Sequence, residues 1–182
     1  MVCKRNPSEP TLKNQRKDDQ MTSTLFLGSA ICEVAQDGTV QVPQFLADAL
    51  TGDAELLLSR HGADTCLVGY GRDHLDTLRT RTEARRLADE ARGEDASGHY
   101  RRMRRTFGVV EKMPRTGSRM TIPAAMRHLG KIAGLALFVG AGDSFEIWNP
   151  DLAIENEDEQ FRDLAAFQLK ARRGSNTALG VH

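Results

Sequence analysis

Two stretches of this sequence, FLGSAICEVAQDGTVQVPQFLADAL at residues 26–50 and FGVVEKMPRTGSRMTIPAAMRHLG at residues 107–130, follow the same order of patterns. Each begins with a strand-like alternation of apolar and polar residues, passes through a turn and returns as a second strand. Each then reaches a Val-Pro or Ile-Pro step, at Pro43 and Pro123, which suits the first turn of a short helix. Further strand pairs follow at residues 54–70 and 135–148.

The spacing of the two copies points to an internal duplication. The offset between Pro43 and Pro123 differs by one residue from that between Asp64 and Asp143, so whole units recur rather than single motifs. Because one unit is too small to bury a self-sufficient core, we expect the two copies to pack on each other as a pseudo-dimer. The sequence therefore predicts a strand-rich α+β fold of tandem ββαββ repeats, an arrangement that can present a two-fold symmetric surface to DNA.

Composition divides the chain into five segments. A polar arm without apolar periodicity precedes the first unit, an arginine-rich helical connector joins the two units, and an acidic helix and tail follow. In chain order these segments cover residues 1–21, 25–71, 72–105, 106–151 and 152–182. The apolar side chains expected to face inward are Leu75, Leu78 and Leu87 in the connector and Phe161, Leu164, Phe167 and Leu169 in the C-terminal helix.

The composition also excludes several classes of protein. The 182 residues carry 25 Lys and Arg against 25 Asp and Glu, so any basic surface must be local. The three cysteines lack metal-ligand spacing and suit a reducing cytoplasm. No apolar run approaches the roughly 20 residues that span a bilayer, and the N-terminus lacks the apolar segment of a secretory signal. We expect a soluble, cytoplasmic protein without a membrane partner.

No arrangement of residues predicts catalysis, a metal or a cofactor. The five histidines are scattered without paired ligand spacing, which argues against a metal site. The glycines of GAGD at residues 140–143 lie between strands and open no helix, so this segment is a turn rather than a nucleotide-binding loop. Because no acid, base and nucleophile are grouped, we expect no enzyme, no cofactor and no small-molecule substrate.

Charge separates the two copies. Five acids and no Lys or Arg lie between Glu33 and Ser59, whereas five bases and no acid lie between Lys112 and Gly142. One face should therefore repel phosphate and the other attract it. An alternative, compatible with the first, is that the acidic copy of one subunit docks on the basic copy of the next and builds a head-to-tail ring.

The basic turn PRTGSR of the second copy is the sharpest candidate site. The hydroxyls of Thr116 and Ser118 suit phosphate oxygens, as do the backbone N–H groups of the tip. A guanidinium from Arg115 or Arg119 can meanwhile reach a guanine edge. Lys112 extends the same positive stretch toward the N-terminus. The alternative is that exposed arginines only solvate a flexible turn.

The connector holds a second basic cluster. It consists of Arg101, Arg102, Arg104 and Arg105. Acidic residues accompany the arginines throughout the connector, so we expect a solvated face, with a separate contact to phosphate as the alternative.

Several of these motifs, taken in order, resemble the MraZ family of bacterial transcriptional regulators, which carry two SpoVT/AbrB-like domains. The resemblance covers about residues 25–151 and rests on FLGS at 26–29, the Val-Pro and Ile-Pro steps, CLVGY at 66–70 and VGAGDSFEIWNP at 139–150. It implies a swapped-hairpin, AbrB-type pseudo-dimer that assembles into cytoplasmic rings and associates with the nucleoid. It also implies binding to repeated boxes upstream of the division and cell-wall gene cluster, which the family represses.

The sequence departs from the family's DNA-contacting signature, a D-x-x-G-R hairpin before each proline-ended strand. In the first copy the aspartate position is Ala35 and the arginine position is Thr39, so only Gly38 matches.

The second copy departs differently. There the aspartate position is Arg115 and the glycine position is Ser118, whereas Arg119 matches. The resemblance therefore assigns a DNA-contacting role to Arg119 alone, and Arg115 is expected to add positive charge where an aspartate would orient the arginine.

These observations favour an oligomeric, DNA-binding repressor that presents the basic hairpin of the second copy to double-stranded DNA. Two alternatives belong to other classes. One is a diverged ring-forming interaction protein that no longer recognises an operator, because its first hairpin is acidic. The other is an antitoxin-like DNA binder whose acidic tail holds a partner.

Overall fold

The structure, a computed structural model, describes residues 25–50 and 54–179, with side chains as far as residue 174. The polar arm expected over residues 1–21 lies outside the described residues. The chain has the predicted mixture of helix and strand. Its first part contains β1 (Ser29–Glu33), β2 (Thr39–Gln41), α1 (Gln44–Ala49), β3 (Leu56–Arg60), β4 (Leu67–Gly71), α2 (His74–Ala91) and α3 (Ser97–Phe107). Its second part contains β5 (Glu111–Met113), β6 (Arg115–Thr116), β7 (Arg119–Thr121), α4 (Ala124–Gly130), β8 (Leu135–Gly140), β9 (Phe145–Trp148), α5 (Pro150–Ala153) and α6 (Glu159–Leu179).

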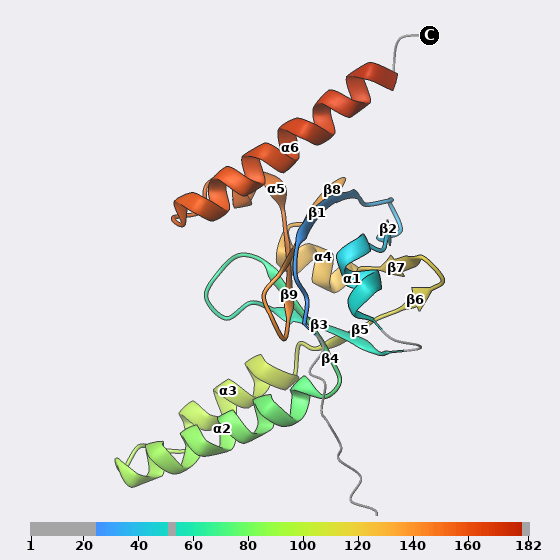
Figure 1. Ribbon diagram of the computed structural model, residues 1–182. Coiled ribbons are helices and arrows are strands. Elements are labelled where there is room, and N and C mark those ends of the chain that lie inside the picture. Colours follow the sequence, from blue (N-terminus) through green and yellow to red (C-terminus); the bar gives the residue numbers. More distant parts are fainter. Residues whose placement is uncertain (1–24, 51–53, 180–182) are drawn as a thin grey trace, which may run out of the picture.

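The strands form two antiparallel sheets in which the two parts of the chain alternate. The larger sheet has six strands in the order β1-β8-β9-β4-β3-β5, and the smaller has three in the order β2-β7-β6. β1 of the first part therefore pairs with β8 of the second, and β5 of the second pairs with β3 of the first. β2 and β7 pair in the same way across the two parts. Figure 1 shows α1 and α4 lying between these strands.

The two proline steps lead into helices, as predicted, but each proline is the N-cap residue rather than a member of the first turn. Pro43 and Pro123 are N-cap residues with extended backbone, ψ 143° and 149°, and the helices begin at the next residue. The Pro43 carbonyl accepts hydrogen bonds from the N–H groups of Leu46 and Ala47, at 3.0 and 2.9 Å. The N–H group of an N-cap residue has no acceptor within the helix. Proline, which lacks this N–H, therefore loses no helical hydrogen bond at that position.

Alternation along the central strands gives the large sheet two apolar faces. Phe138 of β8 and Phe145 of β9 enter the main core, where the Phe145 ring meets Phe26 edge-on at 5.2 Å. Leu137 and Trp148 point to the opposite face, where they form a second cluster under α5 and α6. Side chains on one strand face alternate sides, so β8 and β9 supply both cores.

Two of the expected inward positions are wrong. Phe167 of α6 is 70% exposed, because the buried positions of α6 are Ala165 and Leu169, four residues apart on one face, and Ala165 belongs to the cluster of Leu137 and Trp148. Leu87 of α2 is 54% exposed, because α2 packs only on α3 in that region and the buried side chains of α2 are Thr82 and Asp89.

The α2–α3 hairpin projects from the sheets (Figure 1). Ion pairs hold its two helices. Helix α3 contains no buried side chain. The largely buried Asp89 carboxylate pairs with Arg92 and, across the hairpin, with Arg102. The break between the two helices falls near Gly93.

Candidate nucleic-acid interface

The basic turn folds as a tight two-residue hairpin. Thr116 of β6 pairs directly with Arg119 of β7, so only Gly117 and Ser118 form the loop. Gly117 has φ 58°, whereas Ser118 does not have positive φ. A positive φ at the first loop residue alone is typical of the type II′ turn, in which glycine occupies that position. The backbone conformation of the tip therefore depends on Gly117.

Buried neighbours hold the hairpin with its polar residues outward. Met120 and Ile122 are buried in the main core, so the alternating Arg119 faces away from it and is exposed. β2 pins the hairpin from the other side, because the Val42 N–H donates to the Ser118 carbonyl at 2.8 Å. Gln41 lies directly opposite Arg119 on β2 and is also exposed.

The structure groups four of the five predicted site residues and separates the fifth. Arg115, Thr116, Ser118 and Arg119 lie on the β6–β7 hairpin, where all but the half-buried Arg115 are exposed. Lys112 lies on β5, the edge strand of the other sheet.

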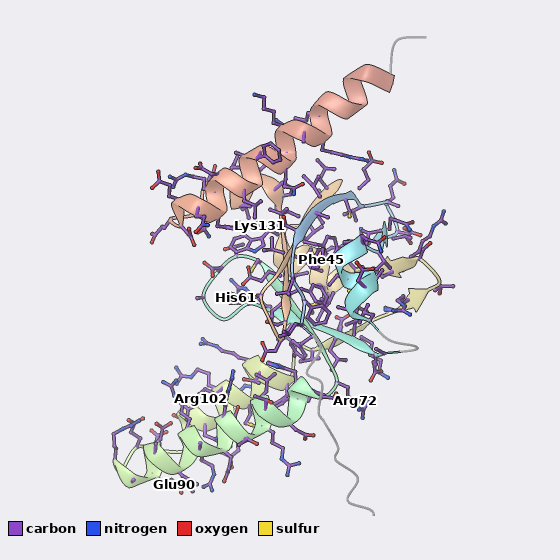
Figure 2. The ribbon with its side chains drawn as sticks, viewed as in Figure 1. Phe45, His61, Arg72, Glu90, Arg102 and Lys131 are labelled. Carbon is purple, nitrogen blue, oxygen red and sulfur yellow. The ribbon has the colours of Figure 1, made fainter. Side chains whose placement is uncertain are left out.

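Lys112 is also engaged within the protein. Its Nζ lies 2.5 Å from Oε1 of Glu55, and Arg72 Nη1 contacts Oε2 of the same carboxylate at 2.8 Å. The hydrogen bonds from Lys112 and then Arg72 lower the pKa of Glu55. Lys112 remains 72% exposed, so its charge still adds to the surface potential although a carboxylate neutralises much of it. Figure 2 labels Arg72 near the end of β4, where it meets the helical hairpin.

The corresponding turn of the first part has a different geometry. Here the Ala35 N–H donates to the Thr39 carbonyl at 2.9 Å, which leaves a three-residue loop ending in Gly38 at φ 90°. A side chain at Gly38 is excluded, because its Cβ would lie 2.4 Å from the Ile122 carbonyl oxygen. In the second copy the corresponding glycine, Gly117, comes one position earlier in the hairpin. The second copy therefore has a two-residue turn where the first has a three-residue loop.

An acidic group occupies the first turn in place of a basic one. The Asp37 carboxylate accepts hydrogen bonds from the Thr39 N–H at 2.9 Å and the Thr39 hydroxyl at 3.0 Å. These bonds, the N–H first, lower the pKa of Asp37, with a smaller contribution from the nearby Arg127. Because β2 and β7 are antiparallel and Thr39 pairs with Thr121, this turn lies at the opposite end of the small sheet from the tip at Gly117. The basic tip is thus free of the acidic turn.

Sequence reasoning missed two residues of this region. Gln41 was not among the candidates, although the outward phase of a short strand beside the basic hairpin is a usable signal. Arg127 was counted only as positive charge, whereas its Nη1 donates to the Gln36 carbonyl at 2.9 Å and fastens the first turn. That contact joins distant parts of the chain, so no local pattern could reveal it.

Two features are absent from the part of the chain that the structure describes, a membrane-spanning helix and a cluster of metal ligands. Across residues 25–50 and 54–179, no helix combines the length and apolar character needed to cross a bilayer. Within the same ranges, no three His, Cys, Asp or Glu side chains gather closely enough to hold a metal ion.

Comparison with known proteins identifies relatives of this chain. The chain is 30% identical over 132 residues to the transcriptional regulator MraZ of Rhodospirillum rubrum, an alignment that spans 69% of this chain and 79% of that protein. The chain belongs to the MraZ family. MraZ regulators of Saccharopolyspora erythraea and Cytophaga hutchinsonii are 26% and 27% identical, over 141 and 147 residues. These alignments span 78% and 77% of this chain and 92% and 91% of those proteins.

Membership of the MraZ family confirms the resemblance seen in the sequence motifs. No family model matches the chain. The MraZ relatives are named as transcriptional regulators and not as enzymes, in agreement with a sequence that groups no catalytic residues.

Proposed function

We propose that this chain is a DNA-binding transcriptional regulator that represses the division and cell-wall gene cluster, its own gene included, by binding repeated promoter boxes. The names of its MraZ relatives support the regulatory role. The single observation that carries the DNA-binding proposal is the β6–β7 hairpin, in which Arg119 is exposed while the next residue, Met120, is buried in the core.

The proposal includes a division of labour along the hairpin. The hydroxyls of Thr116 and Ser118 and the guanidinium of Arg115 contact phosphates and set the register. Arg119 reads a base edge, for which the bidentate pairing of a guanidinium with guanine is the best match. Lys112, paired with Glu55, contributes to the potential rather than to a specific contact.

The fold proposed for this function is a swapped-hairpin pseudo-dimer of two ββαββ copies, residues 25–71 and 106–151. The pairing of β1 with β8, of β5 with β3 and of β2 with β7 supports it, because each copy supplies strands to the other. In this proposal residues 72–105 form the connector and residues 152–182 the acidic C-terminal segment.

We further propose that several chains assemble into a cytoplasmic, nucleoid-associated ring. Support comes from large apolar side chains exposed outside the core, among them Leu87, Tyr100, Met103 and Phe167. Exposed apolar patches commonly mark surfaces that other protein chains cover. A ring would present many copies of the hairpin, so weak single contacts add up to firm binding.

The test is a binding titration of the purified protein on DNA from upstream of its own gene and on a scrambled duplex, between about 50 and 200 mM salt. If an assembly neutralises about six phosphates, affinity falls about a thousandfold over this range. Arg119→Ala should weaken binding and its preference for the upstream DNA, whereas Arg79→Ala, on the exposed face of α2, should leave both unchanged. Equal affinity of the two variants would contradict the assignment of the hairpin.

One observation favours a second candidate, a ring-forming interaction protein without operator recognition. The acidic first copy and the basic second copy already meet at the Glu55–Lys112 ion pair within one chain, and the same complementarity between chains would favour assembly. A shallow salt slope on both duplexes, combined with intact assemblies in analytical ultracentrifugation, would support this candidate over the repressor.

A further inference from the structure

A cavity of about 790 Å³ lies between the β3–β4 loop and the α2–α3 hairpin, away from the basic β6–β7 hairpin. Figure 2 labels His61, which stands in that loop, and Arg102, which stands on α3. The volume is within the range of about 300 to 1,000 Å³ that small-molecule sites occupy. Nothing in the proposed DNA-binding function uses this space.

Basic side chains line much of the cavity, and no Asp or Glu is among its lining residues. Arginines come from β3 and from α3, namely Arg60, Arg101, Arg104 and Arg105. Two histidines, His61 and His74, complete the basic part of the lining.

Some arginines of the helical hairpin are paired with carboxylates, whereas three arginines of the cavity are not. Arg86 pairs with Glu83 and Glu90, and Arg92 pairs with Glu94 and Asp89. By contrast, the cavity residues Arg60, Arg104 and Arg105 form no ion pair within residues 25–50 and 54–179. Three guanidinium groups that line one cavity and are not paired with carboxylates can make charge-assisted hydrogen bonds to a bound anion.

The histidines already have acidic neighbours. His61 Nδ1 lies 3.1 Å from Asp64, and its Nε2 lies 4.0 Å from Glu146. His74 Nδ1 lies 3.4 Å from Asp143. Because each imidazole already has a carboxylate neighbour, the cationic groups available to bind an anion are the arginines.

The rest of the lining is mostly apolar, and the hydroxyl-bearing Ser59 and Thr106 are its further polar members. Val68, Leu78, Val109 and Leu129 contribute aliphatic surface, and Tyr70 contributes a ring. Tyr70 is 2% exposed, and its hydroxyl completes no hydrogen bond within the described residues. Burial raises the pKa of Tyr70, although the nearby Ser59 hydroxyl opposes this rise. A cavity with an apolar wall and an arginine cluster matches a ligand that has an apolar body and an anionic group.

We propose that this cavity binds a small organic anion, a molecule that joins a phosphate, sulfonate or carboxylate group to an apolar or aromatic body. The anionic group contacts the guanidinium groups of Arg60, Arg104 and Arg105, and the body lies against Val68, Tyr70 and Leu78. The ligand is bound without chemical change, so this site adds a small-molecule effector to the DNA-binding function.

The test uses 8-anilinonaphthalene-1-sulfonate, an aromatic sulfonate whose fluorescence rises on binding, titrated into the full-length protein. We expect one saturable site, with phenyl phosphate displacing the dye at lower concentration than inorganic phosphate or benzyl alcohol. N-phenyl-1-naphthylamine has the aromatic body without the sulfonate, and its affinity should be lower by about tenfold or more. Equal binding of the charged and neutral dyes would overturn the proposal.

Variants assign the signal to the cavity. Arg104→Gln removes a charge and should weaken dye binding about tenfold. Ala63→Trp, in the exposed turn at the cavity, should abolish binding by filling the space. Arg85→Gln, on the exposed face of α2 and outside the lining, is the matched control and should bind as the wild type does. Thermal unfolding of each variant tests whether the fold is kept.

Two results would overturn the assignment. Unchanged dye binding in both Arg104→Gln and Ala63→Trp would place the dye elsewhere, for example on the exposed apolar surface of α2 and α3. Loss of DNA affinity in Arg104→Gln, together with displacement of the dye by duplex DNA, would make the cavity arginines DNA contacts instead of a small-molecule site.

Discussion

Arg127 of α4 donates a hydrogen bond from Nη1 to the main-chain oxygen of Gln36, 2.9 Å away, and so fastens the turn between β1 and β2 to a helix from the other part of the chain. The same turn receives a second attachment, because the Ile122 N–H donates to the Gly38 carbonyl at 2.9 Å. The acidic turn is therefore tied to the second part of the chain at two points, one on α4 and one directly after β7.

Removing the Arg127 contact should lower the stability of the whole protein. Arg127→Ala leaves the Gln36 carbonyl without its charged donor, and because the site is partly open to water we expect a loss of about 1–2 kcal/mol in the free energy of unfolding. Urea denaturation followed by circular dichroism measures it. His128→Ala, an exposed neighbour on the same helix, should change the value little; equal losses in both variants would show that the hydrogen bond contributes nothing specific.

The ion pairs of Glu55 should appear in the pH dependence of stability. The folded-state pKa of Glu55 lies below its ordinary value of 4.5, so the unfolded chain takes up the proton first as the solution is acidified. The stabilisation is therefore complete above about pH 4.5 and is lost as the pH falls through the folded-state pKa. Glu55→Gln should show a smaller decrease of the melting temperature between about pH 6 and pH 3 than the wild type.

The control for this pH series is Glu157→Gln, at an exposed position outside the sheets. Its melting temperature should follow the wild-type curve. If the Glu55 variant follows that curve too, Lys112 and Arg72 do not stabilise the fold through this carboxylate.

Asp89 should control the order of the helical hairpin rather than the sheets. Asp89→Asn removes the charge that holds Arg92 and Arg102, and α3 has no buried side chain to compensate. We expect faster hydrogen exchange throughout α2 and α3, because the free energy of local opening of the hairpin falls by about 1–3 kcal/mol. The protection of β8 and β9 should not change. Glu94→Gln, which alters an exposed partner of Arg92, should have a much smaller effect. Uniform loss of protection across the chain would contradict this division.

A guanidinium in the first turn should restore part of the missing DNA contact. Thr39 holds the arginine position of the family signature, and Thr39→Arg adds a positive charge beside β7. If the proposed interface includes this turn, the slope of log affinity against log salt should steepen by about 0.9 for one additional phosphate. Thr39→Gln introduces a longer polar side chain without the charge and should leave the slope unchanged. An unchanged slope in Thr39→Arg would place the first turn outside the DNA interface.

Local patterns predicted most of the elements. The proline steps predicted the starts of α1 and α4, and the alternating pattern predicted a turn between the first two strands of each copy. These features succeed because each depends on the backbone preferences of a few neighbouring residues. The tip at Gly117 was likewise predicted as a turn, although its two-residue form depends on where the glycine stands.

Long-range contacts could not be predicted in this way. The charge pattern suggested that Lys112 was available to phosphate, yet it pairs with Glu55, which is far away in the sequence. Phe167 fitted an amphipathic helix, yet only the position of the sheet decides which face of α6 is covered, and the smaller Ala165 lies there.

The sequence by itself determined the order of strands and helices, the family and the charge of each copy, because these follow from residue types and their spacing. The tertiary structure alone decided which strands pair, which arginines find carboxylates and where a cavity remains. The physical reason is that backbone preference acts over a few residues, whereas ion pairs such as Arg102 with Asp89 and pairings such as β1 with β8 depend on distances that only the folded chain sets.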